Sequence, residues 1–221
     1  MTFDRFLSLA TLVVPLLLLF GISIGAYLKR HLEDRYRFLL IYLGMCLLID
    51  VLSRIVGELY GNNLVFIIIF SLLELVFFYV YYRKFFFKRA VPIYTLITLL
   101  GSIFMLYEMA ALKDVSPKEF QPYSKVICSF IIIVMSINCL FEKMADEQQD
   151  NAVIKLNSAF VIYFSLNLIF FLPVNFLINV ASSVKFYFWS ANLLLTISFY
   201  GFLCKEIWKN GSTRKRLQSG S

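Results

Sequence analysis

The chain has 221 residues, of which 60% are hydrophobic and only 16% are charged, and its mean hydropathy is +0.78. Soluble domains carry charge on roughly 25% of their residues, so this composition excludes a water-soluble domain and indicates a protein whose solvent is the lipid bilayer. The net charge of +7 comes from cations that flank apolar segments. That placement is typical of membrane loops and argues against nucleic acid as a partner.

Long apolar stretches follow one another along the whole chain with short polar breaks. A helix needs roughly 20 apolar residues to cross the hydrocarbon core, and these stretches are continuous rather than alternating. We therefore expect an all-α fold, a polytopic seven-helix transmembrane bundle. The expected helices form one domain over residues 1–209 and cover residues 6–28, 37–59, 64–83, 91–112, 124–142, 153–179 and 186–208. Residues 210–221 are rich in Gly, Ser and cations, and we expect them to form a flexible basic cytoplasmic tail.

Lys and Arg are distributed unequally between the two sets of segments that connect the expected helices. One set, which includes residues 29–37, 83–89 and the tail, collects 15 of them. The other set collects five, with Lys125 counted among them. Because cytoplasmic loops carry an excess of Lys and Arg, we expect the N-terminus outside and the C-terminus in the cytoplasm. The protein is expected to be a multi-pass protein of the cell membrane, in bacteria the inner membrane.

Charged residues at membrane depth are costly to insert, and those present usually face the bundle interior and serve a function. The second expected helix carries Asp50, Arg54 and Glu58 at a spacing of four, which places them on one face. Glu74 of the third helix lies at a similar depth, and Glu108 lies one turn before the outer end of the fourth. A structural alternative is that Asp50 and Arg54 neutralise each other and join the second helix to the third through Glu74.

Three asparagines, Asn167, Asn175 and Asn192, add polar groups to the last two expected helices. Together with the five charged residues they map to the middle and outer half of the membrane. We expect these eight residues to line an outward-facing pocket that binds a small polar ligand or a proton. Acids outnumber the single base in this set, so if the side chains converge, one carboxylate must be protonated or meet a cation.

The sequence indicates neither a metal site nor a cofactor. The four cysteines form no CxxC pair, and the only histidine, His31, lies in a charged loop. Chemistry that requires two or more histidines, such as that of zinc hydrolases, is thereby excluded. No catalytic residue is indicated, and we do not favour an enzyme.

An aromatic run ends the third expected helix. It comprises Phe77, Phe78, Tyr79, Tyr81, Tyr82, Phe85, Phe86 and Phe87. These residues occupy all faces of the helix, so we interpret them as lipid contacts and interfacial anchors. The same region, from Gly61-Asn62-Asn63-Leu64 through Glu74 to the aromatic run, resembles uncharacterised small heptahelical membrane proteins of bacteria. The resemblance covers about 30 residues and implies a sensory or signalling accessory rather than an enzyme.

The leading functional hypothesis is a receptor or sensor that binds a small polar ligand or a proton and signals to a separate cytoplasmic partner. A proton-coupled small-molecule transporter that uses Glu74 or Asp50 is the first alternative. A lipid-modifying enzyme with an acidic pair is the second. A purely structural or assembly role is the remaining possibility, because fold does not define function.

Overall fold

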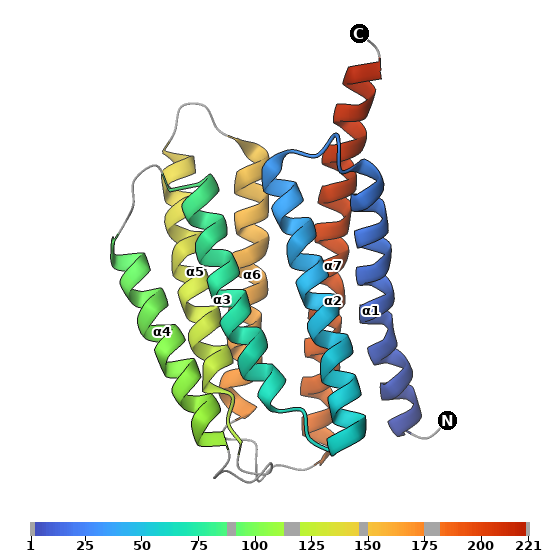
Figure 1. Ribbon diagram of the computed structural model, residues 1–221, viewed down its shortest axis with the longest axis vertical. Coiled ribbons are helices and arrows are strands. Elements are labelled where there is room, and N and C mark those ends of the chain that lie inside the picture. Colours follow the sequence, from blue (N-terminus) through green and yellow to red (C-terminus); the bar gives the residue numbers. More distant parts are fainter. Residues whose placement is uncertain (1–2, 88–91, 113–119, 146–149, 175–181, 220–221) are drawn as a thin grey trace. The chain divides into compact units, whose positions relative to one another are not determined.

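The computed structural model describes residues 3–87, 92–112, 120–145, 150–174 and 182–219, and it is all-α over these ranges (Figure 1). Each expected helix has a counterpart. The helices are α1 (Phe3–Leu28), α2 (Asp34–Tyr60), α3 (Val65–Phe85), α4 (Pro92–Ala111), α5 (Tyr123–Met144), α6 (Asn151–Val174) and α7 (Ser182–Ser219). All but α7 are long and apolar enough to cross a membrane by the composition of their described residues. The protein is therefore a multi-pass helical membrane protein.

Local chemistry supports several of the helix ends. Gly61, with a φ of 67°, occupies the left-handed region directly after α2, where residues other than glycine are strained. At the start of α6, Asp150 Oδ1 accepts hydrogen bonds from the backbone N–H groups of Ala152 and Val153, at 3.0 and 3.2 Å. Arg83 and Lys84 lie in the last turn of α3, where cations interact favourably with the helix dipole.

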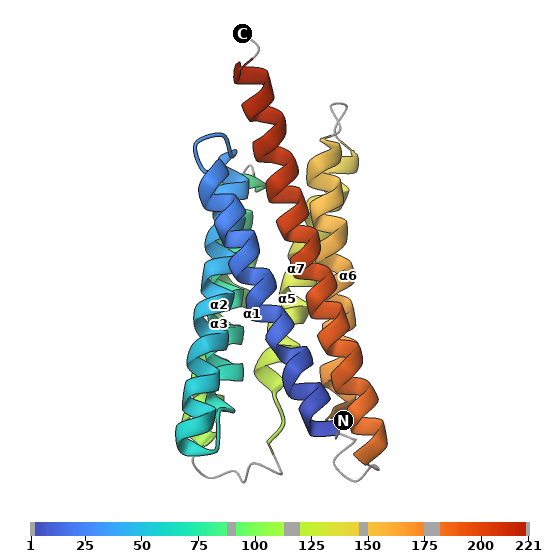
Figure 2. The same cartoon turned by 90° about the vertical axis from the view of Figure 1, so that its right-hand side faces the viewer.

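The chain forms two compact units, Met1–Leu59 with Trp189–Ser221, and Tyr60–Phe188. In the first unit α1 packs against α2 and α7, and small residues allow the close approach (Figures 1 and 2). A Cβ atom on Gly21 would meet both Leu43 of α2 and Cys204 of α7, and one on Gly25 would meet Leu40. Small residues at helix contacts are the usual device by which membrane helices gain packing contacts.

In the second unit α5 contacts α3, α4 and α6, so it is the helix on which the unit is assembled. The core is aromatic. Phe78 is fully buried and its ring packs edge-on against Phe160 and Phe164 of α6, with ring centroids 5.1 Å apart in both pairs. Tyr81 and Tyr82 are also fully buried. The interpretation of the aromatic run as lipid contact is therefore wrong for these three residues and for Phe77 and Phe86, which are also buried. Aromatic side chains of α6 pack on Phe78 and Tyr81, and Tyr82 packs against its neighbours in the run.

Tyr82 also joins three helices by hydrogen bonds. Its hydroxyl oxygen lies 2.7 Å from Ser136 Oγ of α5, and the hydroxyl donates to Asn157 Oδ1 of α6, also at 2.7 Å. Asn157 in turn donates through Nδ2 to the carbonyl of Val153 at 2.9 Å. These hydrogen bonds compensate the Tyr82 hydroxyl for the hydration that it loses on burial.

The helix α7 continues for ten residues beyond the point where we expected a flexible tail, to Ser219. The physical reason is a close contact with α1. A Cβ atom built on Gly211 would lie 2.8 Å from Cβ of Leu28 and 3.1 Å from Cδ2 of Leu32. Gly211 thus allows the helix to lie against the end of α1, and tertiary packing compensates for the poor helix propensity of Gly and Ser.

Substitution of Gly211 tests this contact. We expect Gly211→Leu to reduce the free energy of unfolding by about 1–3 kcal/mol, because the rigid Cβ of Leu28 leaves no room for a side chain. Gly201→Ala is the matched control in the same helix, since a Cβ atom there meets nothing within 4 Å. It should be neutral or stabilise by up to about 1 kcal/mol. Unfolding in detergent micelles measures both, and equal effects of the two substitutions would contradict the contact.

Candidate functional site: a buried ion pair in the second unit

Glu74 of α3 and Lys125 of α5 form an ion pair inside the second unit. Lys125 Nζ lies 2.6 Å from Glu74 Oε2, and the two side chains are 6% and 0% exposed. Glu74 lies near the middle of α3, on the face that also carries the buried residues Ile68, Ser71 and Phe78. Lys125 lies in the first turn of α5, and its long side chain reaches the carboxylate. In a pair this deeply buried, each charge needs the opposite charge to compensate for its loss of hydration.

Neighbouring side chains from the same two helices complete the surroundings of the ion pair. The Cys128 thiol, one turn after Lys125, donates to Glu74 Oε2 at 3.7 Å. The ring of Phe70, one turn before Glu74, lies beneath the ammonium group with Nζ 4.8 Å from its centroid. A cation near an aromatic face is stabilised electrostatically, and more so where water is excluded. Within the described residues no group of three His, Cys, Asp or Glu side chains is arranged to hold a metal ion.

Two buried polar groups at the depth of the ion pair have no hydrogen-bond partner among the described residues. They are the hydroxyl of Ser129, which is 0% exposed, and the amide Nδ2 of Asn167, which is 2% exposed. Ser129 lies one turn after Lys125 on the same face of α5. Buried polar groups are nearly always paired, and an unpaired one costs about 1–3 kcal/mol. Unpaired donors at the depth of a buried ion pair therefore require an explanation.

The depth of Asn167 follows from the register of the helices. Tyr82 connects Ser136 of α5 with Asn157 of the antiparallel helix α6 and so defines a common level. At a rise of about 1.5 Å per residue, Ser129 lies about 10 Å from that level, Asn167 about 15 Å and Lys125 about 16 Å. Figures 1 and 2 show α5 and α6 side by side over this length. Asn167 thus lies between the levels of Ser129 and Lys125.

Glu108 has a different environment, at the end of α4. Its two carboxylate oxygens accept the backbone N–H groups of Tyr123, at 3.1 Å, and Ser124, at 2.8 Å. The Ser124 hydroxyl also donates to Glu108. These N–H groups begin α5 and have no partner within the helix, so a carboxylate there both satisfies them and complements the helix dipole. The contacts of Glu108 are those of a helix cap that joins α4 to α5.

Asp50 and Arg54 pair with each other in the first unit. Arg54 Nε lies 2.8 Å from Asp50 Oδ2, and the side chains are 35% and 26% exposed. A second nitrogen of Arg54, Nη2, donates to the carbonyl of Thr11 at 2.9 Å. The pair is thus neutral and attaches α2 to α1. This agrees with the structural alternative as far as the mutual neutralisation of Asp50 and Arg54 is concerned.

The remaining candidate residues, Glu58, Asn192 and Asn175, differ in location and exposure. Glu58 is exposed near the end of α2, and Asn192 is half-buried in α7, in the first unit. The Asn192 Oδ1 atom is buried without a hydrogen-bond partner within the described part of the chain. Asn175 lies outside the described residues. The second unit therefore brings Glu74 and Asn167 to one depth, while a common pocket of all eight residues stays a prediction.

Lys125 is the functional candidate that sequence reasoning missed. It was assigned to the outer connecting segments, although it lies inside the helix expected over residues 124–142, and the structure places it in α5. That position was the available signal: a lysine inside an apolar span needs a carboxylate within reach. Its pairing with Glu74 also removes much of the excess of acids that the sequence implied.

Comparison of the chain with protein-family models, with curated proteins and with solved structures found no match. The resemblance to small heptahelical proteins stays a prediction.

The mutual dependence of the two charges can be measured. We expect Lys125→Met to reduce the free energy of unfolding by about 3–5 kcal/mol, because it leaves the Glu74 carboxylate buried without a partner. Glu74→Met should have a similar effect for the opposite reason. The double substitution should recover most of the loss, since two apolar side chains of similar volume leave no uncompensated charge. A double variant as unstable as the two single variants combined would contradict the buried pair.

Proposed function

We propose that the protein is a membrane receptor or sensor in which a small polar ligand binds beside the Glu74–Lys125 ion pair. The observation that carries the proposal is the coincidence of this fully buried pair with two unpartnered buried groups, Ser129 Oγ and Asn167 Nδ2, at the same depth. In this proposal the protein lies in the bacterial inner membrane with its N-terminus outside. It signals to a separate cytoplasmic partner through the basic connecting segments.

Stability alone explains the ion pair poorly. Insertion of a charge at the centre of a membrane helix costs about 2.5–3.5 kcal/mol. A polar contact between membrane helices returns on average about 0.6 kcal/mol. Apolar residues of similar volume often stabilise a buried site as well as an ion pair or better. A function for Glu74 and Lys125 accounts for their presence more simply than packing does.

The polar groups around the pair suggest the chemistry of the ligand. Lys125, Ser129 and Asn167 all offer hydrogen-bond donors, and only Glu74 offers a carboxylate. A ligand that carries an acidic group would bind these donors and compete with Glu74 for the ammonium group. A donor or cationic group on the same ligand would then satisfy Glu74. Small molecules with both kinds of group, of which amino acids are the simplest, fit these requirements.

Competition for Lys125 provides a route from binding to signalling. The ion pair directly connects α3 to α5. A ligand that takes over Lys125 favours a state in which this connection is loosened. The population of that state rises according to how much more tightly the ligand binds it than the paired state. Helix shifts of one or two ångströms are a common output of such transitions. The α3–α5 contact is thus the element that we expect to have two arrangements.

A proton-coupled transporter is the alternative that the buried carboxylate favours, because Glu74 could take up a proton when Lys125 leaves it. Transport requires the site to open to both faces of the membrane, whereas a receptor stays closed on the inner side. Cys139 of α5 is 1% exposed and distinguishes the two cases. Ligand-dependent labelling of Cys139 by a thiol reagent would favour transport.

Thermal-shift measurements against a panel of amino acids and other small charged metabolites test the proposal. We expect at least one compound to raise the melting temperature of the wild type. Asn167→Leu and Ser129→Ala should reduce or abolish that shift without early melting, since neither group has a partner to lose.

Ser102→Ala is the control, because the Ser102 hydroxyl donates to the Thr98 carbonyl of its own helix, at 2.8 Å. It should keep the full ligand-dependent shift. Absence of stabilisation by any compound, with Asn167→Leu and Ser129→Ala indistinguishable from the control, would argue for a structural ion pair and against a ligand site.

A further inference from the structure

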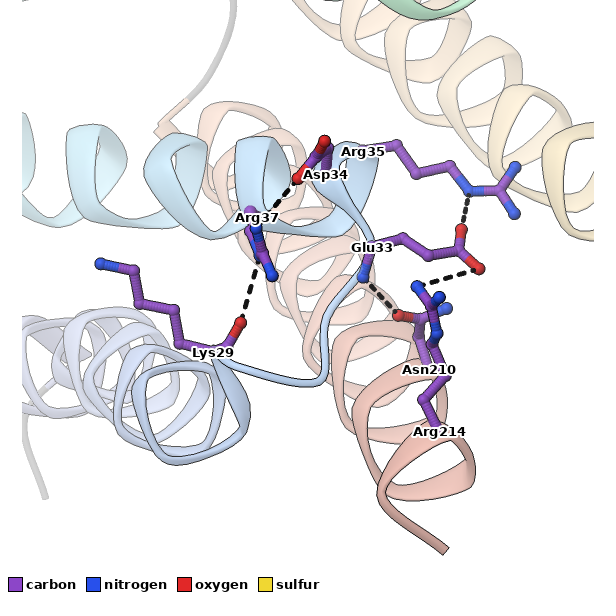
Figure 3. A network of polar contacts seen from close by, with 7 residues as sticks. All are labelled: Lys29, Glu33, Asp34, Arg35, Arg37, Asn210 and Arg214. Atoms are coloured by element: carbon purple, nitrogen blue, oxygen red, sulfur yellow. Dashed lines mark hydrogen bonds and ion pairs between the residues drawn. The ribbon is translucent and has the colours of Figure 1, made fainter. Parts of the chain in front are cut away.

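A hydrogen bond and an ion pair join the C-terminal part of α7 to the loop between α1 and α2 (Figure 3). The Glu33 backbone N–H donates to Asn210 Oδ1 at 3.2 Å. The Glu33 carboxylate lies between two arginines, 2.7 Å from Arg35 Nε and 3.7 Å from Arg214 Nη1. On the α1 side, Lys215 Nζ donates to the Tyr27 hydroxyl at 2.9 Å. Arg214 and Lys215 therefore attach this part of α7 to the rest of the first unit.

Three other cations of α7 form a row along the outer face of the helix. Lys205, Lys209 and Arg216 are spaced by four and seven residues, which places them within about 40° of one another around the axis. All three are exposed, whereas Leu203, Cys204 and Ile207 on the opposite face are buried. Within the described part of the chain neither Lys205 nor Lys209 forms an ion pair. Lys205 and Lys209 thus present unneutralised positive charge outward, and the exposed guanidinium group of Arg216 continues the row.

The row lies at the expected membrane boundary. Gly211 packs on Leu28, the last residue of α1, and the exposed cations Lys29 and Arg30 follow at once. Trp208, 58% exposed, lies between the two lysines of the row, and tryptophan is enriched at the membrane–water interface. Lysine side chains that start below this level extend to it, with the stem in the apolar region and the ammonium group among headgroups.

The same face of α7 is apolar and open below the row. Leu194 lies on this face and is 65% exposed. Gly201, between Leu194 and Lys205, leaves open space where a side chain would be, since a Cβ atom there meets nothing within 4 Å. One continuous face therefore passes from an open apolar surface to a row of cations.

Few acids offset the positive charge at this end of the first unit. Segments 29–37 and 205–216 contain nine Lys and Arg against three Asp and Glu, a surplus of six positive charges. Two of the acids are already engaged, Glu33 with Arg35 and Arg214, and Asp34 with Arg37 at 3.0 Å. The third, Glu206, is 4% exposed. The acids of these two segments therefore offset only part of their positive charge.

We propose that the outer face of α7 is a binding site for anionic phospholipids. The phosphate-bearing headgroup lies among Lys205, Lys209 and Arg216, and an acyl chain follows the open face past Gly201 toward Leu194. The row begins at the end of an apolar segment, a depth that a lipid headgroup occupies and a soluble acidic protein or a nucleic acid does not. Because the α7 end is attached to Glu33, lipid bound there also stabilises the α1–α2 loop.

Lipid retention by the purified full-length protein tests this site. Native mass spectrometry in detergent compares added phosphatidylglycerol with phosphatidylcholine. Each cation near a lipid surface contributes about 1 kcal/mol, or roughly a fivefold change in affinity. Wild-type protein should therefore prefer phosphatidylglycerol. In K205Q/K209Q/R216Q the ratio of phosphatidylglycerol affinity to phosphatidylcholine affinity should fall at least about tenfold.

Two control variants make the outcome specific. K205R/K209R keeps the charges and should bind phosphatidylglycerol like the wild type. K143Q/K155Q removes cations of the second unit and should also keep the preference. Equal losses in K143Q/K155Q and in the α7 variant would overturn the site, since net charge alone would then explain binding. A wild type without preference, or one that binds soluble polyglutamate in place of the lipid, would overturn it as well.

Discussion

A lipid bilayer offers no water to charged or polar groups within its core, and the described interior of this protein is organised around that constraint. The Glu74 carboxylate is held by the Lys125 ammonium group at 2.6 Å, with both side chains almost fully buried. Neither residue could remain charged alone at that depth without a cost of several kcal/mol. At the contact between α3 and α5, each of these two charges therefore requires the other, which is not the case for apolar side chains that pack together. One to two turns further along α3, Phe78 forms the aromatic core with α6, and the Tyr82 hydroxyl joins α3 to α5 and α6.

The same constraint makes buried polar groups without hydrogen-bond partners candidates for ligand binding. Most buried polar side chains of the second unit have partners, as Asn157 and Ser136 illustrate. Ser129 and Asn167 depart from that rule at the depth of the ion pair. Unpaired donors at the depth of a buried charge can bind a ligand that brings acceptors, which is the basis of the proposed receptor function. At the expected membrane boundary, charged groups need no protein partner because water and headgroups are available there. The cations Lys205, Lys209 and Arg216 of α7 are exposed at this boundary.

Much of the fold follows from the sequence, because a stretch of some 20 apolar residues has one stable arrangement in lipid, a helix. Glu74 could be singled out for the same reason, as a charge inside such a stretch. Lys125 lies inside such a stretch as well, but its pairing with Glu74 could not be predicted. The two residues are 51 apart along the chain, and only the packing of α3 against α5 brings them together. The aromatic run was misread because burial of Phe78 depends on which helix covers it. The helical end of α7 was missed because its stability comes from the contact of Gly211 with Leu28 rather than from its own composition.

The central claim is that Glu74 and Lys125 are bound to each other inside the membrane. Solid-state NMR on the full-length protein in bilayers, with ¹⁵N-labelled lysine and ¹³C-labelled glutamate, measures the dipolar coupling between Lys125 Nζ and the Glu74 carboxyl carbon. The spectrum of Lys125→Met assigns the signal. We predict a strong coupling that disappears in this variant, as a nitrogen-to-oxygen distance of 2.6 Å requires. A Lys125 signal without coupling to any glutamate carboxyl carbon would contradict the ion pair and the function proposed for it.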